Sequence, residues 1–76
     1  MNKARRTKLE NLLERFAEIK TEIEAVGEEE QEAFENMPEN LQLSKRGQRV
    51  EGNADILYYV VDHINEIEDW LNEVIN

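Results

Sequence analysis

The chain has 76 residues, no cysteine and a formal net charge of −9. This length allows one small domain, and below about 80 residues a single core rarely contributes more than ~3–5 kcal/mol without disulfides, metals or self-association. The composition excludes disulfides and thiolate metal sites, and the charge disfavours nonspecific binding to nucleic acid or anionic lipid and favours basic partners.

The hydrophobic residues are periodic, and no run of them approaches the roughly 20 residues of a membrane-spanning helix. The basic beginning of the chain leads into a pattern that Glu10 and Glu14 interrupt, unlike the apolar segment of a signal peptide. We therefore expect a soluble, cytoplasmic protein that folds, at least with a copy of itself, and that binds neither membrane nor nucleic acid directly.

Apolar residues recur at alternating steps of three and four in the first half of the chain. They are Leu9, Leu12, Phe16, Ile19, Ile23 and Val26. This spacing predicts an amphipathic helix over about residues 3–36. Gly27 is its weak point, because glycine inside a helix costs up to ~1 kcal/mol relative to alanine. We favour a continuous helix, since Ala33, Phe34 and Met37 resume the stripe, whereas a break at Gly27 would give three helices.

The periodicity lapses over about residues 37–47, where we expect the chain to reverse. Pro38 disfavours helical geometry in the residue before it and cannot lie inside a helix without removing a hydrogen bond. Pro38 could instead begin a single helical turn. In that case, Leu41 and Leu43 are expected to cover the end of the core.

A second apolar stripe predicts a second amphipathic helix, over about residues 45–75. Its members are Val50, Leu57, Val60, Ile64, Ile67, Leu71 and Val74. Ser44 is the candidate N-cap of this helix. The sequence therefore predicts an all-α fold, an antiparallel helical hairpin that forms a single domain over residues 1–76.

The order of charges also favours an antiparallel pair. Residues 1–20 hold six of the nine basic side chains, whereas residues 62–76 are acidic and contain no lysine or arginine. At the other end, Lys45, Arg46 and Arg49 would approach the acidic end of the first helix. Each exposed ion pair contributes only ~0–1 kcal/mol, so we expect these charges to select orientation and partner more than to stabilise the fold.

The apolar face of each predicted helix is wider than one neighbouring helix can cover. The residues that flank the two stripes are Leu13, Phe34, Ile56, Val61, Trp70 and Ile75. We expect them to form the interface of a homodimer in which two hairpins make a four-helix bundle. A complex with a host protein could bury the same surface.

Few side chains are available for catalysis or metal binding. His63 is the only histidine and Ser44 the only serine, so the chain has almost no residues that could act as a catalytic nucleophile and its base. His63 and Glu66 are three residues apart, but Val60 stands where a dicarboxylate metal bundle has the glutamate of its Glu-x-x-His motif. We expect no enzyme activity, no cofactor and no metal site.

An aromatic pair among acids is the first candidate for partner binding. Tyr58 and Tyr59 fall outside the second stripe, near Asp55 and Asp62. Aromatic side chains anchor many protein interfaces, and the neighbouring acids suit a basic partner. The alternative is that one tyrosine only covers the rim of the bundle.

An acidic band is the second candidate. Residues 22–39 hold eight carboxylates and no basic residue, and Glu28, Glu29, Glu32 and Glu35 are among them. Charges spaced along a helix could imitate a phosphate backbone and occupy a nucleic-acid-binding enzyme. A solvated helix face is the alternative, because part of the band would lie near the basic residues of the turn.

The middle of the chain resembles a segment of known proteins. Residues 28–42, Glu-Glu-Glu-Gln-Glu-Ala-Phe-Glu-Asn-Met-Pro-Glu-Asn-Leu-Gln, with the following Ser44, Arg46 and Gly47, are similar to a segment of small acidic helical proteins encoded by bacteriophages and prophages, mostly of Gram-positive hosts. Gly27 departs from the helix-forming residues expected just before this segment. The resemblance implies a phage setting, in which small proteins often bind and inhibit host machinery, including defence nucleases.

Together these patterns favour a non-enzymatic protein-binding module. The leading hypothesis is an inhibitor or adaptor that acts in the host cytoplasm on a host protein with a basic surface. Two alternatives stay open at this point: an acidic DNA mimic that blocks a nucleic-acid-binding enzyme, and a structural or morphogenesis protein of the phage.

Overall fold

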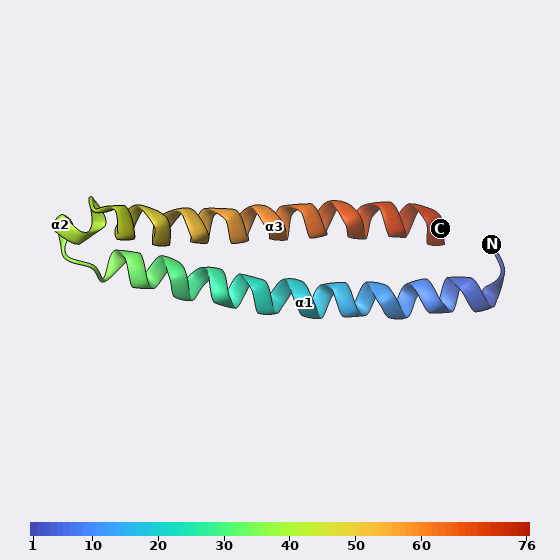
Figure 1. Cartoon of the computed structure of the whole chain (residues 1–76). Helices are drawn as coiled ribbons and strands as arrows, with labels where there is room; N and C mark the ends of the chain where they lie inside the picture. The colour runs from blue at the N-terminus through green and yellow to red at the C-terminus, as the bar shows by residue number, and fades with distance from the viewer.

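The computed structural model describes residues 1–76 and contains three helices and no strand: α1 (Lys3–Glu35), α2 (Glu39–Gln42) and α3 (Lys45–Ile75). Helices α1 and α3 lie side by side and antiparallel, with α2 at the closed end and both termini at the other end (Figure 1). The molecule is a rod of 58 × 15 × 12 Å. The prediction of an all-α fold with two long packed helices is confirmed.

Side chains cap the beginning of each long helix. The Asn2 side chain accepts a hydrogen bond from the Arg5 N–H at 2.8 Å, a cap that the sequence analysis did not identify. Ser44 is the N-cap of α3, as expected, and its hydroxyl oxygen accepts from the Gly47 N–H at 3.2 Å. At the far end, the Arg6 Nε donates to the Ile75 carbonyl at 3.0 Å, so a cation meets the partial negative charge at the C-terminus of α3.

Helix α1 continues through Gly27, as we favoured from the sequence. Gly27 is buried, and a Cβ atom there would lie 3.2 Å from Tyr58 Cε1 and 3.6 Å from Leu57 Cβ. The absence of a side chain therefore lets α3 pack closely against α1 at this level. The packing between the helices offsets the helix-forming cost of the glycine.

The closed end is held by close backbone packing. A Cβ atom on Gly47 would collide with the Leu41 carbonyl and lie 2.6 Å from the Gln42 carbonyl oxygen, so only glycine fits between α2 and α3. The Gln42 side chain turns inward and donates from Nε2 to the Phe34 carbonyl at 3.1 Å. Because Gln42 occupies the inward position, the expectation that Leu41 and Leu43 cover the core is wrong: Leu43 is 74% exposed.

The contact between α1 and α3 follows one regular series on each helix, which we call the hairpin seam. Its residues are Arg6, Leu9, Leu13, Phe16, Lys20, Ile23, Gly27, Glu30 and Phe34 on α1, and Gly47, Val50, Ala54, Leu57, Val61, Ile64, Glu68, Leu71 and Ile75 on α3. Every one of them is buried or half-buried, at alternating steps of three and four. The hydrophobic core proper is small and comprises Ala54, Val61 and Ile64.

This seam corrects the register inferred from the sequence. Val61 was expected to flank the stripe, but it is buried between the helices, whereas Val74, expected inside the stripe, is 53% exposed. The reason is that small and charged residues, such as Ala54 and Glu68, occupy seam positions on α3. A stripe defined only by large apolar residues is therefore displaced to one side of the true contact.

Candidate protein-binding surface

The hairpin seam has two unlike sides, because different residues neighbour it on each side of an antiparallel pair. We call one side the apolar flank: Leu12, Ile19 and Val26 on α1, and Ile56, Val60, Ile67, Trp70 and Val74 on α3. We call the other the polar flank: Glu10, Ala17, Glu24 and Gln31 on α1, and Glu51, Tyr58, Asn65 and Asn72 on α3. Two surface grooves support this division, since Val26 shares one with Ile56, and Glu10 shares the other with Asn72.

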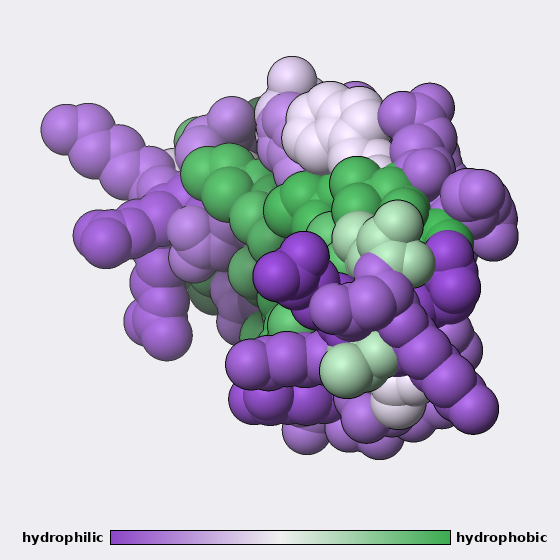
Figure 2. Space-filling model, turned by 90° about the vertical axis from the view of Figure 1, so that its right-hand side faces the viewer, coloured by the Kyte–Doolittle hydropathy of each residue, from purple (hydrophilic) through white to green (hydrophobic).

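The apolar flank exposes large hydrophobic side chains from both helices. Ile19, Val26, Ile56, Trp70 and Val74 are each between 44% and 63% exposed. Figure 2, a view onto the end that carries both termini, shows a group of hydrophobic side chains at the surface, bordered by hydrophilic ones. A contiguous apolar surface of this kind marks a site of protein interaction more often than a scattered exposed residue does.

The two helices contribute to the apolar flank at the same level of the rod. Its residues on α1 extend from Leu12 to Val26 and are centred on Ile19, and those on α3 extend from Ile56 to Val74 and are centred on Asn65. These centres lie opposite each other, because Lys20, the neighbour of Ile19, donates a hydrogen bond to Asn65. The exposed apolar residues therefore form one surface across both helices.

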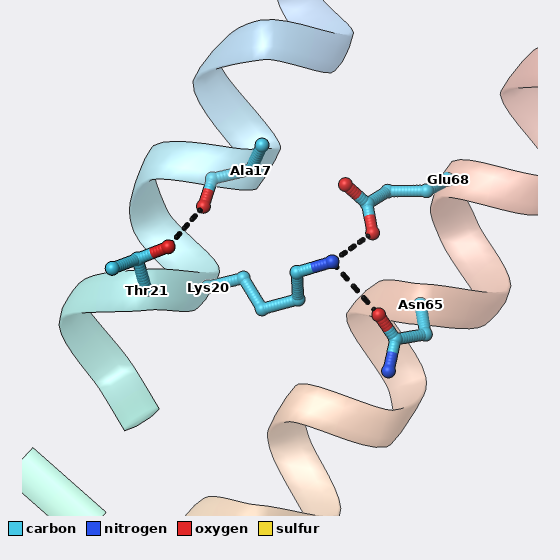
Figure 3. Close-up of polar contacts among 5 residues, drawn as sticks. All are labelled: Ala17, Lys20, Thr21, Asn65 and Glu68. Atoms are coloured by element: carbon cyan, nitrogen blue, oxygen red, sulfur yellow. Dashed lines mark hydrogen bonds and ion pairs between the residues drawn. The ribbon is translucent and has the colours of Figure 1, made fainter. Parts of the chain in front are cut away.

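On the polar flank, side chains of the chain itself close the gap between the helices. Lys20 reaches across from α1, and its Nζ lies 2.6 Å from Glu68 Oε1 and 2.8 Å from Asn65 Oδ1 (Figure 3). Thr21, in contrast, bonds the Ala17 carbonyl of its own helix at 3.1 Å. Lys20–Glu68 is the only ion pair between α1 and α3, and it joins the basic region 1–20 to the acidic region 62–76, as expected. The pairing expected at the closed end, between the basic residues at the start of α3 and the acids of α1, does not form.

The predicted tyrosine pair does not form one patch. Tyr58 belongs to the polar flank, where its ring packs over Gly27, and it shares that side with the exposed Asp55 and Asp62. Tyr59 is 65% exposed and lies edge-on to His63, with ring centroids 4.8 Å apart. Consecutive helix residues point about 100° apart, so these two rings lie on different sides of α3.

The acidic residues singled out in the sequence, Glu28, Glu29, Glu32 and Glu35, are all exposed on α1. The one side-chain contact among them is a hydrogen bond from Gln31 to Glu35 at 3.0 Å. Neither these glutamates nor the basic residues at the start of α3 take part in an ion pair. The acids therefore lie open to solvent.

The six residues expected at a dimer interface divide between two environments. Ile56 and Trp70 lie on the apolar flank and are exposed. Leu13, Phe34, Val61 and Ile75 lie in the hairpin seam. Val60, Ile67 and Val74 were assigned to the seam from sequence but lie on the apolar flank. The alternative series through Gly47, Ala54 and Glu68 was the signal that could have placed them there.

No other cluster of side chains indicates a metal-binding or catalytic site. His63 Nδ1 lies 3.6 Å from Glu66 Oε2, both exposed, and the side chains form no group of three or more that could hold a metal ion. The Ser44 hydroxyl is engaged in capping α3.

None of the helices is apolar over a length that would cross a bilayer. Comparisons with known protein families, curated proteins and solved structures found no match.

Proposed function

We propose that this protein is a non-enzymatic protein-binding module that acts as a homodimer, a four-helix bundle joined through the apolar flank. The observation that carries the proposal is that large apolar side chains of α1 and α3 form one exposed surface at the same level of the rod. Two hairpins that face each other through this surface bury it in the manner of a helix bundle.

The surface area of the chain supports a second copy. A compact monomer of 9.0 kDa exposes about 4,900 Å². This chain exposes 5924 Å², an excess of about 1,000 Å², which is comparable with the ~800 Å² that each partner buries in a standard interface. With only three core residues buried in the hairpin, association supplies the core that one copy lacks.

The proposed dimer leaves Glu28, Glu32 and Glu35 of α1 on the outside. The exposed glutamates of α1 and the net charge of −9 suit a partner protein with a basic surface. Together with the resemblance of residues 28–42 to phage-encoded proteins, this charge supports an inhibitor or adaptor that acts on a host protein.

Light scattering at micromolar concentration tests the dimer. We expect the wild type at twice 9.0 kDa and Ile19→Asp as a monomer, because a buried carboxylate disrupts an apolar interface. Thr21→Asp is the matched control, since Thr21 is exposed and bonds its own helix, and it should stay dimeric. A wild-type monomer with full helicity would contradict the proposal.

A competition experiment tests the partner. Protein captured from a Gram-positive lysate on the wild type should be lost on a variant that carries Glu28→Lys and Glu32→Lys, and duplex DNA should not displace it. Displacement by DNA, with a steep loss of affinity as salt rises, would instead identify a DNA mimic.

A further inference from the structure

The charged residues that border the apolar flank on α1 change sign halfway along the helix. Lys8 and Arg15 border its first half, and Glu22 and Glu29 its second half. All four are exposed, and none takes part in either ion pair of the structure. Arg15 lines an otherwise apolar groove with Leu12, Phe16 and Ile19. These charges are therefore free to meet a molecule that covers the flank.

The four charges are arranged symmetrically. They follow one another every seven residues, about two helical turns, and so share one face of α1. The midpoint of the series lies beside Ile19, which is also the centre of the apolar flank on α1. Consider a two-fold axis at this level that is perpendicular to the long axis of the rod and parallel to the line from α1 to α3. Rotation about it places the basic half of α1 in one copy opposite the acidic half of α1 in the other. It also maps the α3 part of the flank, centred on Asn65, onto itself.

We infer that the apolar flank receives a second copy of this chain about such a two-fold axis, with α1 antiparallel to α1 and α3 antiparallel to α3 of the second copy. This inference rests on the proposed dimer and names its register. Arg15 then faces Glu22 of the second copy, and Lys8 faces Glu29 of the second copy. Each pair occurs twice, so opposite charges line the outer edge of the α1 contact.

The other stacking of two hairpins places α1 on α3 of the second copy. In that arrangement Glu29 comes to the level of Ile56, an exposed apolar side chain. The α1-on-α1 arrangement instead gives each of the four charges an opposite charge. Charge complementarity therefore favours the α1-on-α1 arrangement, since the four bordering charges on α1, Lys8, Arg15, Glu22 and Glu29, all gain an opposite partner when the helix meets itself in reverse.

Disulfide cross-linking tests the register, because the chain has no cysteine of its own. Ile19→Cys should form a covalent dimer on mild oxidation, since Ile19 lies beside the axis. Leu12→Cys and Val26→Cys should each stay unlinked alone, because each residue is about 21 Å from its own copy along the helix. A mixture of these two variants should form a covalent dimer. Thr21→Cys is the negative control.

Charge reversal tests the pairing along this outer edge. Arg15→Glu should weaken the dimer roughly tenfold in Kd at low salt, and adding Glu22→Arg should restore it. Lys3→Glu makes the same change in net charge on the polar side and should have little effect. The difference between the variants should vanish at about 1 M salt, where screening is strong.

The outcomes separate this register from the dimer itself. If Ile19→Cys links to Ile67→Cys and not to itself, α1 stacks on α3 and the register is wrong while the dimer stands. If Arg15→Glu dimerises as tightly as Lys3→Glu at low salt, the charge pairing is wrong. A wild-type monomer in light scattering would overturn the proposed function and the register together.

Discussion

The two flanks of the hairpin seam differ in how the side chains beside the contact between α1 and α3 are covered. Beside the polar flank, the seam residues Lys20 and Glu68 form an ion pair between the helices, and the Tyr58 ring of this flank lies over Gly27. On the apolar flank, Ile56 and Trp70 are exposed, at 63% and 60%. In the proposed dimer, a second copy covers this flank.

This contrast shows why a two-helix protein can have an interface without a pocket. A hairpin of two long helices has no third long helix to cover its apolar flank. An apolar stripe wider than the seam is therefore either exposed to solvent or buried against a second protein. In the proposed dimer, the polar side chains on one flank leave only the apolar flank for association. Variants on each flank test this asymmetry.

A carboxylate placed on each flank of α3 should separate the two sides most strongly. Ile67→Asp should weaken the dimer roughly 100-fold or more, because it puts a charge in the proposed apolar contact. Asn65→Asp, two residues away on the polar flank, should leave dimerisation unchanged, since Lys20 already lies 2.8 Å from that side chain. Sedimentation equilibrium measures both, and equal effects would contradict the distinction between the flanks.

Removing the cation that closes the polar flank should lower stability without changing the dimer register. Lys20 and Glu68 are 22% and 15% exposed, so Lys20→Met leaves a largely buried carboxylate without its partner and should cost about 1–3 kcal/mol. The double variant with Glu68→Met should recover most of this loss. Urea unfolding at one fixed protein concentration gives the free energies. No recovery in the double variant would mean that Lys20 stabilises by packing alone.

Adjacent tyrosines should respond differently because they belong to different sides of α3. Tyr58→Ala removes the ring over Gly27 and should cost about 1–2 kcal/mol of unfolding free energy. Tyr59→Ala should change stability by less than about 0.5 kcal/mol, since its ring is 65% exposed. Thermal unfolding followed by circular dichroism compares them. If loss of Tyr59 is the more costly change, its contact with His63 is more important than its exposure indicates.

Much of the fold could be predicted from local patterns. The stripe of apolar residues indicated both long helices, and Ser44 marked the start of α3 because a hydroxyl before a helical stretch is a strong N-cap signal. Continuity through Gly27 followed from the resumption of the stripe. These features depend on residues near one another in sequence, and so they can be recognised without the partner helix.

The register could not be predicted in the same way. Both the series through Val60, Ile67 and Val74 and the series through Ala54, Val61 and Glu68 have helical spacing on α3, and the first is the more hydrophobic. The hydrophobic pattern therefore favoured a series that lies beside the seam, where Val60 and Ile67 are half-buried and Val74 is exposed. The sequence placed Ile56 and Trp70 of the candidate site at an interface, but it assigned the other residues of the apolar flank to the contact between the helices.

By itself, the sequence determined the helices, their ends and the surplus of apolar surface, because propensity, capping and periodicity act over a few residues. Tertiary structure alone decided which stripe is covered. The Tyr58 ring lies against Gly27 and Lys20 pairs with Glu68 only when α1 and α3 are packed together, and in this packing Ala54 faces inward. Close packing between helices selects the face that fits, and Ile56, Trp70 and Val74 remain exposed.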